Sequence, residues 1–181
     1  IKKILLFTLI ACFLFTSGVQ AQDNFIIDLN YTSFDEGSVV QSGFRANIQE
    51  RFSVMANINN FSTFMGDFVG LDLLAGVNFE FEPALSNYPS DNTLLAGLRF
   101  NEFDDRGFLM KFISRQDFTE DIFLEGDIEF VIWPEADSAL KNSLKVGYQI
   151  VDEFAVKGGI DSVSSSGNFS WGLSLGMESR F

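Results

Sequence analysis

The sequence predicts an all-β fold: a closed, antiparallel, up-and-down β-barrel of ten strands, with eight strands as the alternative. Three observations carry this prediction. Apolar and polar residues alternate along ten separate windows, which is the period of a half-buried strand. The chain has 22 Phe, and its 15 Gly against 3 Pro suit strands joined by tight turns. No window shows the i, i+3, i+4, i+7 spacing of an amphipathic helix.

The composition excludes several classes of function. The chain has 181 residues, and no Pro- or Ser-rich linker divides it, so one domain is expected. A net charge of −13 argues against nucleic acid, because phosphate contacts need clustered Lys and Arg. A single Cys leaves no disulfide framework and no Cys-based zinc site. His is absent, which removes the commonest general base and transition-metal ligand. We therefore expect no enzyme, no cofactor and no nucleic-acid partner.

Residues 1–21 are predicted to be a secretory signal peptide. Two lysines precede a 12-residue apolar run, which is shorter than the ~20 residues of a transmembrane helix. Small residues follow the run, so cleavage is expected after Ala21. The alternative is a lipoprotein processing box ending at Cys12, but the apolar run continues past Cys12, where such a box would close it. Residues 22–181 then form the mature barrel domain.

The first five strands are predicted from strict alternation. In the first window, Ile27 and Leu29 share one parity, whereas Asp28 and Asn30 occupy the other. The windows and their apolar residues are 24–33 (Phe25, Ile27, Leu29, Tyr31), 39–49 (Val40, Phe44, Ala46, Ile48), 52–60 (Phe52, Val54, Ala56, Ile58), 69–82 (Leu71, Leu73, Ala75, Val77, Phe79, Phe81) and 93–103 (Leu94, Ala96, Leu98, Phe100).

The last five strands follow the same rule, with one weak member. In 107–115, Leu109 and Ile113 share the polar parity with Lys111 and Arg115, so this alternation is the poorest of the ten. The windows and their apolar residues are 107–115 (Phe108, Met110, Phe112), 122–133 (Ile122, Leu124, Ile128, Phe130, Ile132), 143–150 (Leu144, Val146, Tyr148, Ile150), 154–162 (Phe154, Val156, Ile160) and 169–181 (Phe169, Trp171, Leu173, Leu175, Met177, Phe181).

The two parities are predicted to face different surroundings. Windows of roughly 9–12 residues match the ~25 Å apolar band of a membrane barrel, so the apolar parity is expected to face lipid. The polar parity mixes glycines with long charged side chains, as a narrow lumen requires, because large side chains must fit over small neighbours. These glycines are Gly43, Gly76, Gly97, Gly147, Gly159, Gly172 and Gly176.

The C-terminal segment resembles the closing strand of Gram-negative outer-membrane β-barrel proteins. In that family the chain often ends on an aromatic residue, and the outer-membrane assembly machinery reads a pattern in the last strand. Ser174, Gly176 and Phe181 match the pattern, whereas Ser179 stands where an apolar or aromatic residue is expected. The resemblance implies a small barrel of the eight-to-ten-stranded class in the outer membrane, with both termini in the periplasm and contact with the assembly machinery.

The most pointed group of candidate functional residues is Glu125, Asp127 and Glu129. On a strand these carboxylates share one face, roughly 7 Å apart. They suit either a cation site or a negatively lined pore. The alternative is a structural network in the lumen, because enclosed charges must be paired and seven bases share the inward parity with nine acids. We favour this network and predict that Lys111 lies opposite Asp127 and that Lys145 lies opposite Glu129. Arg45 and Arg99 belong to the same predicted network.

The remaining expectations concern surface and role. The connections near Asp35 and Asp104 are acidic, so they are expected to be solvated loops, with cation bridging to lipopolysaccharide as an alternative. The protein is expected to be an integral outer-membrane barrel with a largely filled polar lumen, in contact with outer-membrane lipid and lipopolysaccharide, and with a structural or surface role without catalysis. One alternative is a narrow, porin-like passive pore for small solutes, whose acidic lining would favour cations. Another is a secreted soluble β-barrel that binds an apolar ligand. The oligomeric state stays open.

Overall fold

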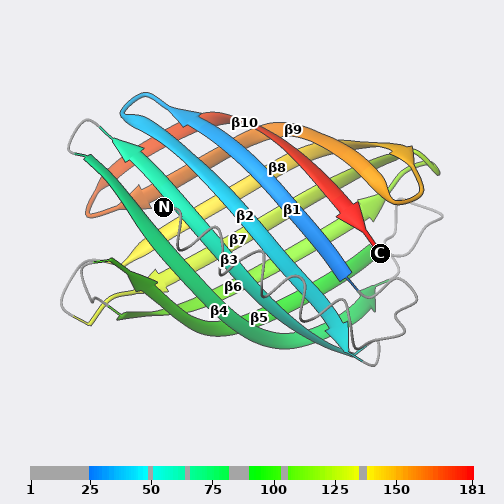
Figure 1. Cartoon of the computed structure of the whole chain (residues 1–181), viewed down its shortest axis with the longest axis horizontal. Helices are drawn as coiled ribbons and strands as arrows, with labels where there is room; N and C mark the ends of the chain where they lie inside the picture. Colours follow the sequence, from blue (N-terminus) through cyan, green and yellow to red (C-terminus); the bar gives the residue numbers. More distant parts are fainter. Residues whose placement is uncertain (1–24, 49–50, 64–65, 82–89, 103–105, 135–137) are drawn as a thin grey trace.

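The structure is a computed structural model, which describes residues 25–48, 51–63, 66–81, 90–102, 106–134 and 138–181. Ten antiparallel strands close into one barrel (Figure 1), which confirms the all-β fold and the count of ten. The predicted signal peptide lies outside the described residues. The strands are β1 (Phe25–Phe34), β2 (Gly37–Ile48), β3 (Phe52–Thr63), β4 (Gly66–Phe81), β5 (Ser90–Asn101), β6 (Arg106–Asp117), β7 (Ile122–Ile132), β8 (Ala139–Val151), β9 (Phe154–Ser165) and β10 (Asn168–Arg180).

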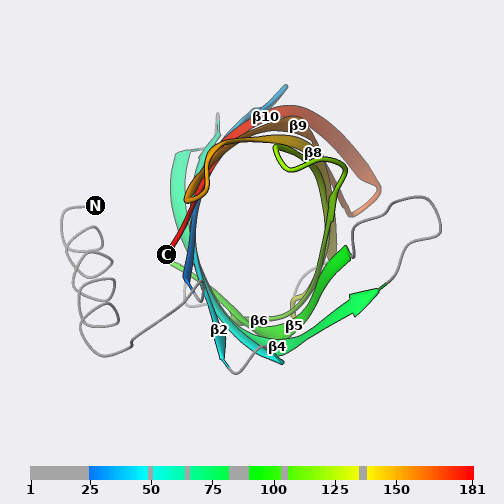
Figure 2. The same cartoon turned by 90° about the vertical axis from the view of Figure 1, so that its right-hand side faces the viewer.

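The first and the last strand pair with each other and close the barrel. Each strand pairs with its neighbours in sequence, and β1 pairs with β10 to complete the ring seen in Figure 2. The seam ends in two backbone hydrogen bonds: Phe181 N–H donates to Phe25 O at 2.9 Å, and Phe25 N–H donates to Phe181 O at 3.1 Å. Both ends of the described chain therefore lie at the same end of the barrel. No helix in the described ranges is long and apolar enough to cross a membrane.

Side chains alternate between the outside and the lumen as the sequence predicts. On β10, Leu173 and Leu175 are 63% and 69% exposed, whereas Ser174 and Glu178 are 2% and 1% exposed. The outer surface is thus built from large apolar side chains, and most polar side chains point inward. This arrangement is the reverse of a water-soluble sheet protein, in which the apolar set is buried.

Inward glycines let the wall bend and let large side chains enter the lumen. A Cβ on Gly97 would lie 1.9 Å from the backbone O of Leu73, so no other residue fits where β5 passes β4. A Cβ on Gly147 would lie 2.0 Å from the ring of Phe123, which fills the space that the glycine leaves. Glycine at such positions allows the tight curvature of a small barrel.

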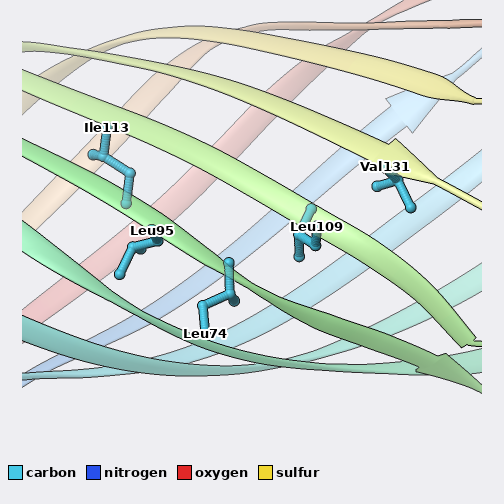
Figure 3. Packing of buried hydrophobic residues seen from close by; sticks show 5 residues of the cluster. All are labelled: Leu74, Leu95, Leu109, Ile113 and Val131. Atoms are coloured by element: carbon cyan, nitrogen blue, oxygen red, sulfur yellow. The ribbon is translucent and has the colours of Figure 1, made fainter.

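Part of the lumen wall is apolar, which the sequence-based expectation of a polar lumen missed. Five inward side chains from β4 to β7 form a buried cluster (Figure 3), and Met55 and Trp133 pack against it. This cluster explains the poor alternation of β6, because two of its members are the inward Leu109 and Ile113. The five are Leu74, Leu95, Leu109, Ile113 and Val131.

Candidate functional site: the charged lumen

The charged lumen contains three groups of ion pairs, and the first is built around Arg99. The guanidinium binds Asp72 with two hydrogen bonds, from Nε to Oδ1 at 2.6 Å and from Nη2 to Oδ2 at 2.8 Å. Nη2 also donates to Oε1 of Glu129 at 2.6 Å, so one cation links β4 to β7. Asn59 adds a hydrogen bond to Asp72 Oδ2 at 2.9 Å. Such bidentate pairs are the stronger kind of charge-assisted hydrogen bond.

The second group is built around Lys157 on β9. Its Nζ lies 2.6 Å from Asp28 Oδ1, 3.0 Å from Glu125 Oε1 and 3.1 Å from Glu178 Oε2. The Lys157 side chain has no exposed surface. Three carboxylates from β1, β7 and β10 therefore share one buried ammonium group, and removing that group would leave them facing one another.

Arg115 extends the second group toward the end of the barrel that holds the chain termini. Its Nη1 donates to Glu178 Oε1 at 2.9 Å, and its guanidinium carbon lies 3.4 Å from the centroid of the Phe123 ring. Arg180 Nε donates to the same Glu178 oxygen at 2.7 Å. Phe123 in turn occupies the space beside Gly147. The Phe123 ring and the guanidinium groups of Arg115 and Arg180 thus occupy this part of the lumen.

The third group is built around Asp161, which is fully buried. Its carboxylate accepts hydrogen bonds from Thr32 Oγ1 at 2.5 Å and from Ser143 Oγ at 2.6 Å. Lys141 and Lys145 lie at the longer distances of 3.8 and 3.9 Å. Short bonds to neutral hydroxyls therefore hold this carboxylate, while the two lysines balance its charge.

The three groups together leave the lumen close to neutral. Eight carboxylates and seven basic groups take part in the ion pairs of the described residues, and Arg45 adds an eighth cation to the same lumen. Enclosed charges are tolerated only when they are paired in this way. The carboxylates are Asp28, Asp72, Asp117, Glu125, Asp127, Glu129, Asp161 and Glu178.

The three predicted carboxylates of β7 separate toward different bases. Glu125 contacts Lys157, Asp127 lies 3.7 Å from Lys111, and Glu129 contacts Arg99. Within the described part of the chain, no group of three or more acidic side chains has the arrangement of a metal site. The arrangement therefore suits charge pairing along the wall.

The predicted register of these pairs was wrong, although their facing was right. Lys111 lies opposite Glu129 instead of Asp127, and Glu129 lies opposite Lys141 instead of Lys145. The β6–β7 turn is centred later than predicted, because Phe118 and Thr119 both donate to Ile122 O. The β7–β8 connection is centred earlier than predicted. Each shift is an even number of residues, so every side chain keeps its side of the sheet.

Three predicted members of the network carry polar atoms without a hydrogen-bond partner. Within the described residues, these buried atoms are Arg45 Nε, Asp127 Oδ1 and Glu129 Oε2. Arg45 and Asp127 line a cavity of about 30 Å³ inside the lumen, together with Lys111, Lys145 and Glu125. A space of this size admits about one or two water molecules. This cavity among the charged side chains therefore has room for solvent only.

Several important inward residues were absent from the predicted network. Asp28, Lys157 and Glu178 follow the inward alternation, but nothing local in the sequence shows that they meet, because they lie on three different strands. Ser174 and Gly176 of the predicted assembly signal point inward on β10, and Phe181 follows that strand. Recognition of these residues by the assembly machinery stays a prediction.

Comparisons with known proteins give matches by structure only. No protein-family model and no curated protein sequence matches the chain. The KdgM porin aligns with a TM-score of 0.53 and 9% identity, over 86% of this chain and 99% of that chain. The translocator domain of the autotransporter NalP from Neisseria meningitidis aligns with a TM-score of 0.52 and 11% identity, over 99% of this chain and 96% of that chain. At such identities the likeness concerns the fold alone.

Proposed function

We propose that this chain, which has the fold of the small outer-membrane β-barrels, resides in that membrane as a closed barrel with a structural or surface role and no catalysis. The single observation that carries the proposal is the filled lumen. Ion pairs and the apolar cluster share the inward face of β4 to β7, further ion pairs line β8, β9, β10 and β1, and a cavity among the charged residues measures about 30 Å³. We therefore expect the lumen to exclude solutes larger than water.

The outer surface supports residence in a membrane. Its large apolar side chains are exposed on all ten strands, and the charged network, which a soluble protein would expose to water, is here enclosed by the wall. Strands of 10–16 residues are long enough to cross the ~25 Å apolar band of an outer membrane at the usual tilt. A soluble barrel would leave this surface in contact with water at a large cost in free energy.

Planar-bilayer recording of the purified protein tests the closed lumen. We expect no stepwise conductance from the wild type, because ion pairs and the apolar cluster occupy the lumen. Arg99→Ala combined with Glu129→Ala serves as the positive control, since it removes the side chains that link β5 and β7 across β6. Stepwise conductance from the wild type would replace this proposal with the narrow-pore alternative.

Detergent dependence tests the membrane location separately. We expect the folded barrel to stay in solution only with detergent and to migrate faster on a gel before heating than after it. A barrel that stays folded and monodisperse in buffer alone would instead favour the secreted, ligand-binding alternative. The two experiments therefore separate all three candidate roles.

A further inference from the structure

A hollow of about 580 Å³ indents the outward apolar face of β8, β9, β10 and β1. Its floor is Gly158 on β9, which the register places between Val146 of β8 and Leu175 of β10. Because Gly158 has no side chain, these two neighbours stand as walls above it. Tyr31 and Tyr148 lie at its margins. A volume of this size falls within the ~300–1,000 Å³ of clefts that bind small molecules.

The same face carries a pair of polar side chains within its apolar surface. Asn142 on β8 and Ser162 on β9 are opposed in the register and point outward by alternation. Leu140 and Phe169, nearer the end of the barrel, are 38% and 70% exposed, so the polar pair lies inside the apolar band. In the part of the chain that the structure describes, neither polar side chain makes a hydrogen bond. A polar group in apolar surroundings needs a partner.

We propose that this face binds one membrane lipid, whose acyl chain lies in the hollow and whose ester carbonyls accept hydrogen bonds from Asn142 and Ser162. The chemistry of the donors indicates esters, because an amide and a hydroxyl are neutral and the described outward positions of β8, β9, β10 and β1 hold no Lys or Arg for a phosphate. The inference rests on the proposed membrane location.

The spacing of the two features fits one leaflet. Val146, beside the hollow, follows Asn142 by four residues on β8, which is about 14 Å along the strand and, at the usual tilt of 35–45°, about 10–11 Å of membrane depth. Half of the ~25 Å apolar band is nearly the same depth. Asn142 lies near the start of β8 and Ser162 near the end of β9, so both lie toward the end of the barrel away from the chain termini. With both chain termini expected in the periplasm, that end meets the outer leaflet, so the acyl chains and esters of lipopolysaccharide are the expected occupant, and phosphatidylethanolamine serves as a probe of the acyl and ester contacts.

Native mass spectrometry from detergent micelles tests the hollow, with palmitoyl-oleoyl phosphatidylethanolamine as the added probe. We expect the wild type to retain one lipid and Gly158→Leu to retain about tenfold less, since a side chain would occupy the acyl position. Gly126→Leu is the matched control, because Gly126 is also outward but lies outside the hollow. An added Cβ meets its nearest atom at 3.7 Å for Gly158 and at 3.8 Å for Gly126, so both variants are expected to fold.

The polar pair is tested with a second lipid. A phosphatidylethanolamine with two ether links lacks the carbonyls, so the wild type is expected to retain it about three- to tenfold less than the diester. Asn142→Leu combined with Ser162→Ala is expected to abolish that preference. Val146→Phe, which fills the hollow from its side, repeats the first test if Gly158→Leu does not fold.

Three results would overturn the inference. Equal lipid retention by the wild type and both hollow-filling variants would remove the acyl site. No preference for the diester would remove the role of Asn142 and Ser162. A dimer that Gly158→Leu abolishes would identify a second copy of the chain as the occupant. A barrel that needs no detergent would instead refute the proposed membrane location, which is a distinct failure.

Discussion

Lys157 shows at the scale of one residue how the lumen is held together. Its ammonium group is the shared partner of Asp28, Glu125 and Glu178, and its side chain is fully buried. Removing one partner of a buried ion pair costs more than the pair contributes, because the remaining charges stay enclosed and unpaired.

We therefore expect Lys157→Met to lower the free energy of unfolding by about 3–5 kcal/mol. Urea titration of the protein in detergent micelles measures this loss. Lys141→Met is the matched control, since Lys141 is 19% exposed and its ion pair with Asp161 is 3.8 Å long. Similar losses in the two variants would show that Lys157 has no special place in the network.

The sequence predicts which residues enter the lumen but not which of them meet. Alternation places Lys157 and Glu125 inward, yet they lie on β9 and β7, so the contact passes over β8. Arg99 reaches Glu129 in the same way, over β6. The register of adjacent strands predicts contacts between neighbouring strands only, whereas long side chains in a narrow lumen reach partners two strands away.

At the scale of the strand, alternation predicts well which segments form strands, but it predicts less well at which residues each strand begins and ends. The prediction of 122–133 differs from β7 (Ile122–Ile132) by one residue. The prediction of 143–150 misses the first four residues of β8, because the outward Asn142 breaks the alternation there. In β6, the inward apolar side chains of the buried cluster likewise weakened the alternation. In each case the pattern fails where a face carries the less usual kind of side chain.

Leu173 on β10 tests the outward face. We expect Leu173→Arg to lower the free energy of unfolding by about 2–4 kcal/mol, because it places a charge in the apolar band. Ser174→Ala is the control: Ser174 is the inward neighbour, and its hydroxyl has no hydrogen-bond partner among the described residues. Urea titration in micelles should therefore show little change for the control. A loss for Leu173→Arg as small as that for Ser174→Ala would mean that Leu173 does not face the apolar band.

Phe181 tests the predicted assembly signal of the closing strand. Its backbone pairs with Phe25, and those hydrogen bonds do not need the ring. We expect Phe181→Ala to refold in micelles almost as the wild type does, but to reach the outer membrane of cells in much smaller amounts. Cell fractionation with the gel shift on heating measures the second quantity. Equal amounts of folded barrel in cells would remove Phe181 from the signal.

At the scale of the whole molecule, the sequence predicts a closed barrel because the polar parity mixes glycines with long charged side chains, as a narrow lumen requires, and because the last strand resembles the closing strand of outer-membrane barrels. The sequence does not predict the volume of the lumen, since this volume depends on how the inward side chains of all ten strands pack together. The apolar cluster and the Arg99 group show this most clearly, because each draws its members from several strands.

Export provides a prediction for the chain as a whole. Cleavage after Ala21 should leave Gln22 as the first residue of the mature protein. Intact-mass measurement of protein isolated from membranes checks the site directly. A mass that corresponds to a lipid-modified Cys12 would instead support the lipoprotein alternative.

The β1–β10 seam also determines the order in which the molecule folds. Every other pairing joins strands that are adjacent in sequence, whereas the seam joins Ile26 to Arg180 across almost the whole mature chain. Contacts of such high contact order are slow to form, because the entropy of closing the long loop must be lost first. The hairpins therefore form early and the seam last. Until then β1 and β10 expose unpaired edges that pair readily with other chains, so the barrel needs protection from aggregation before it closes.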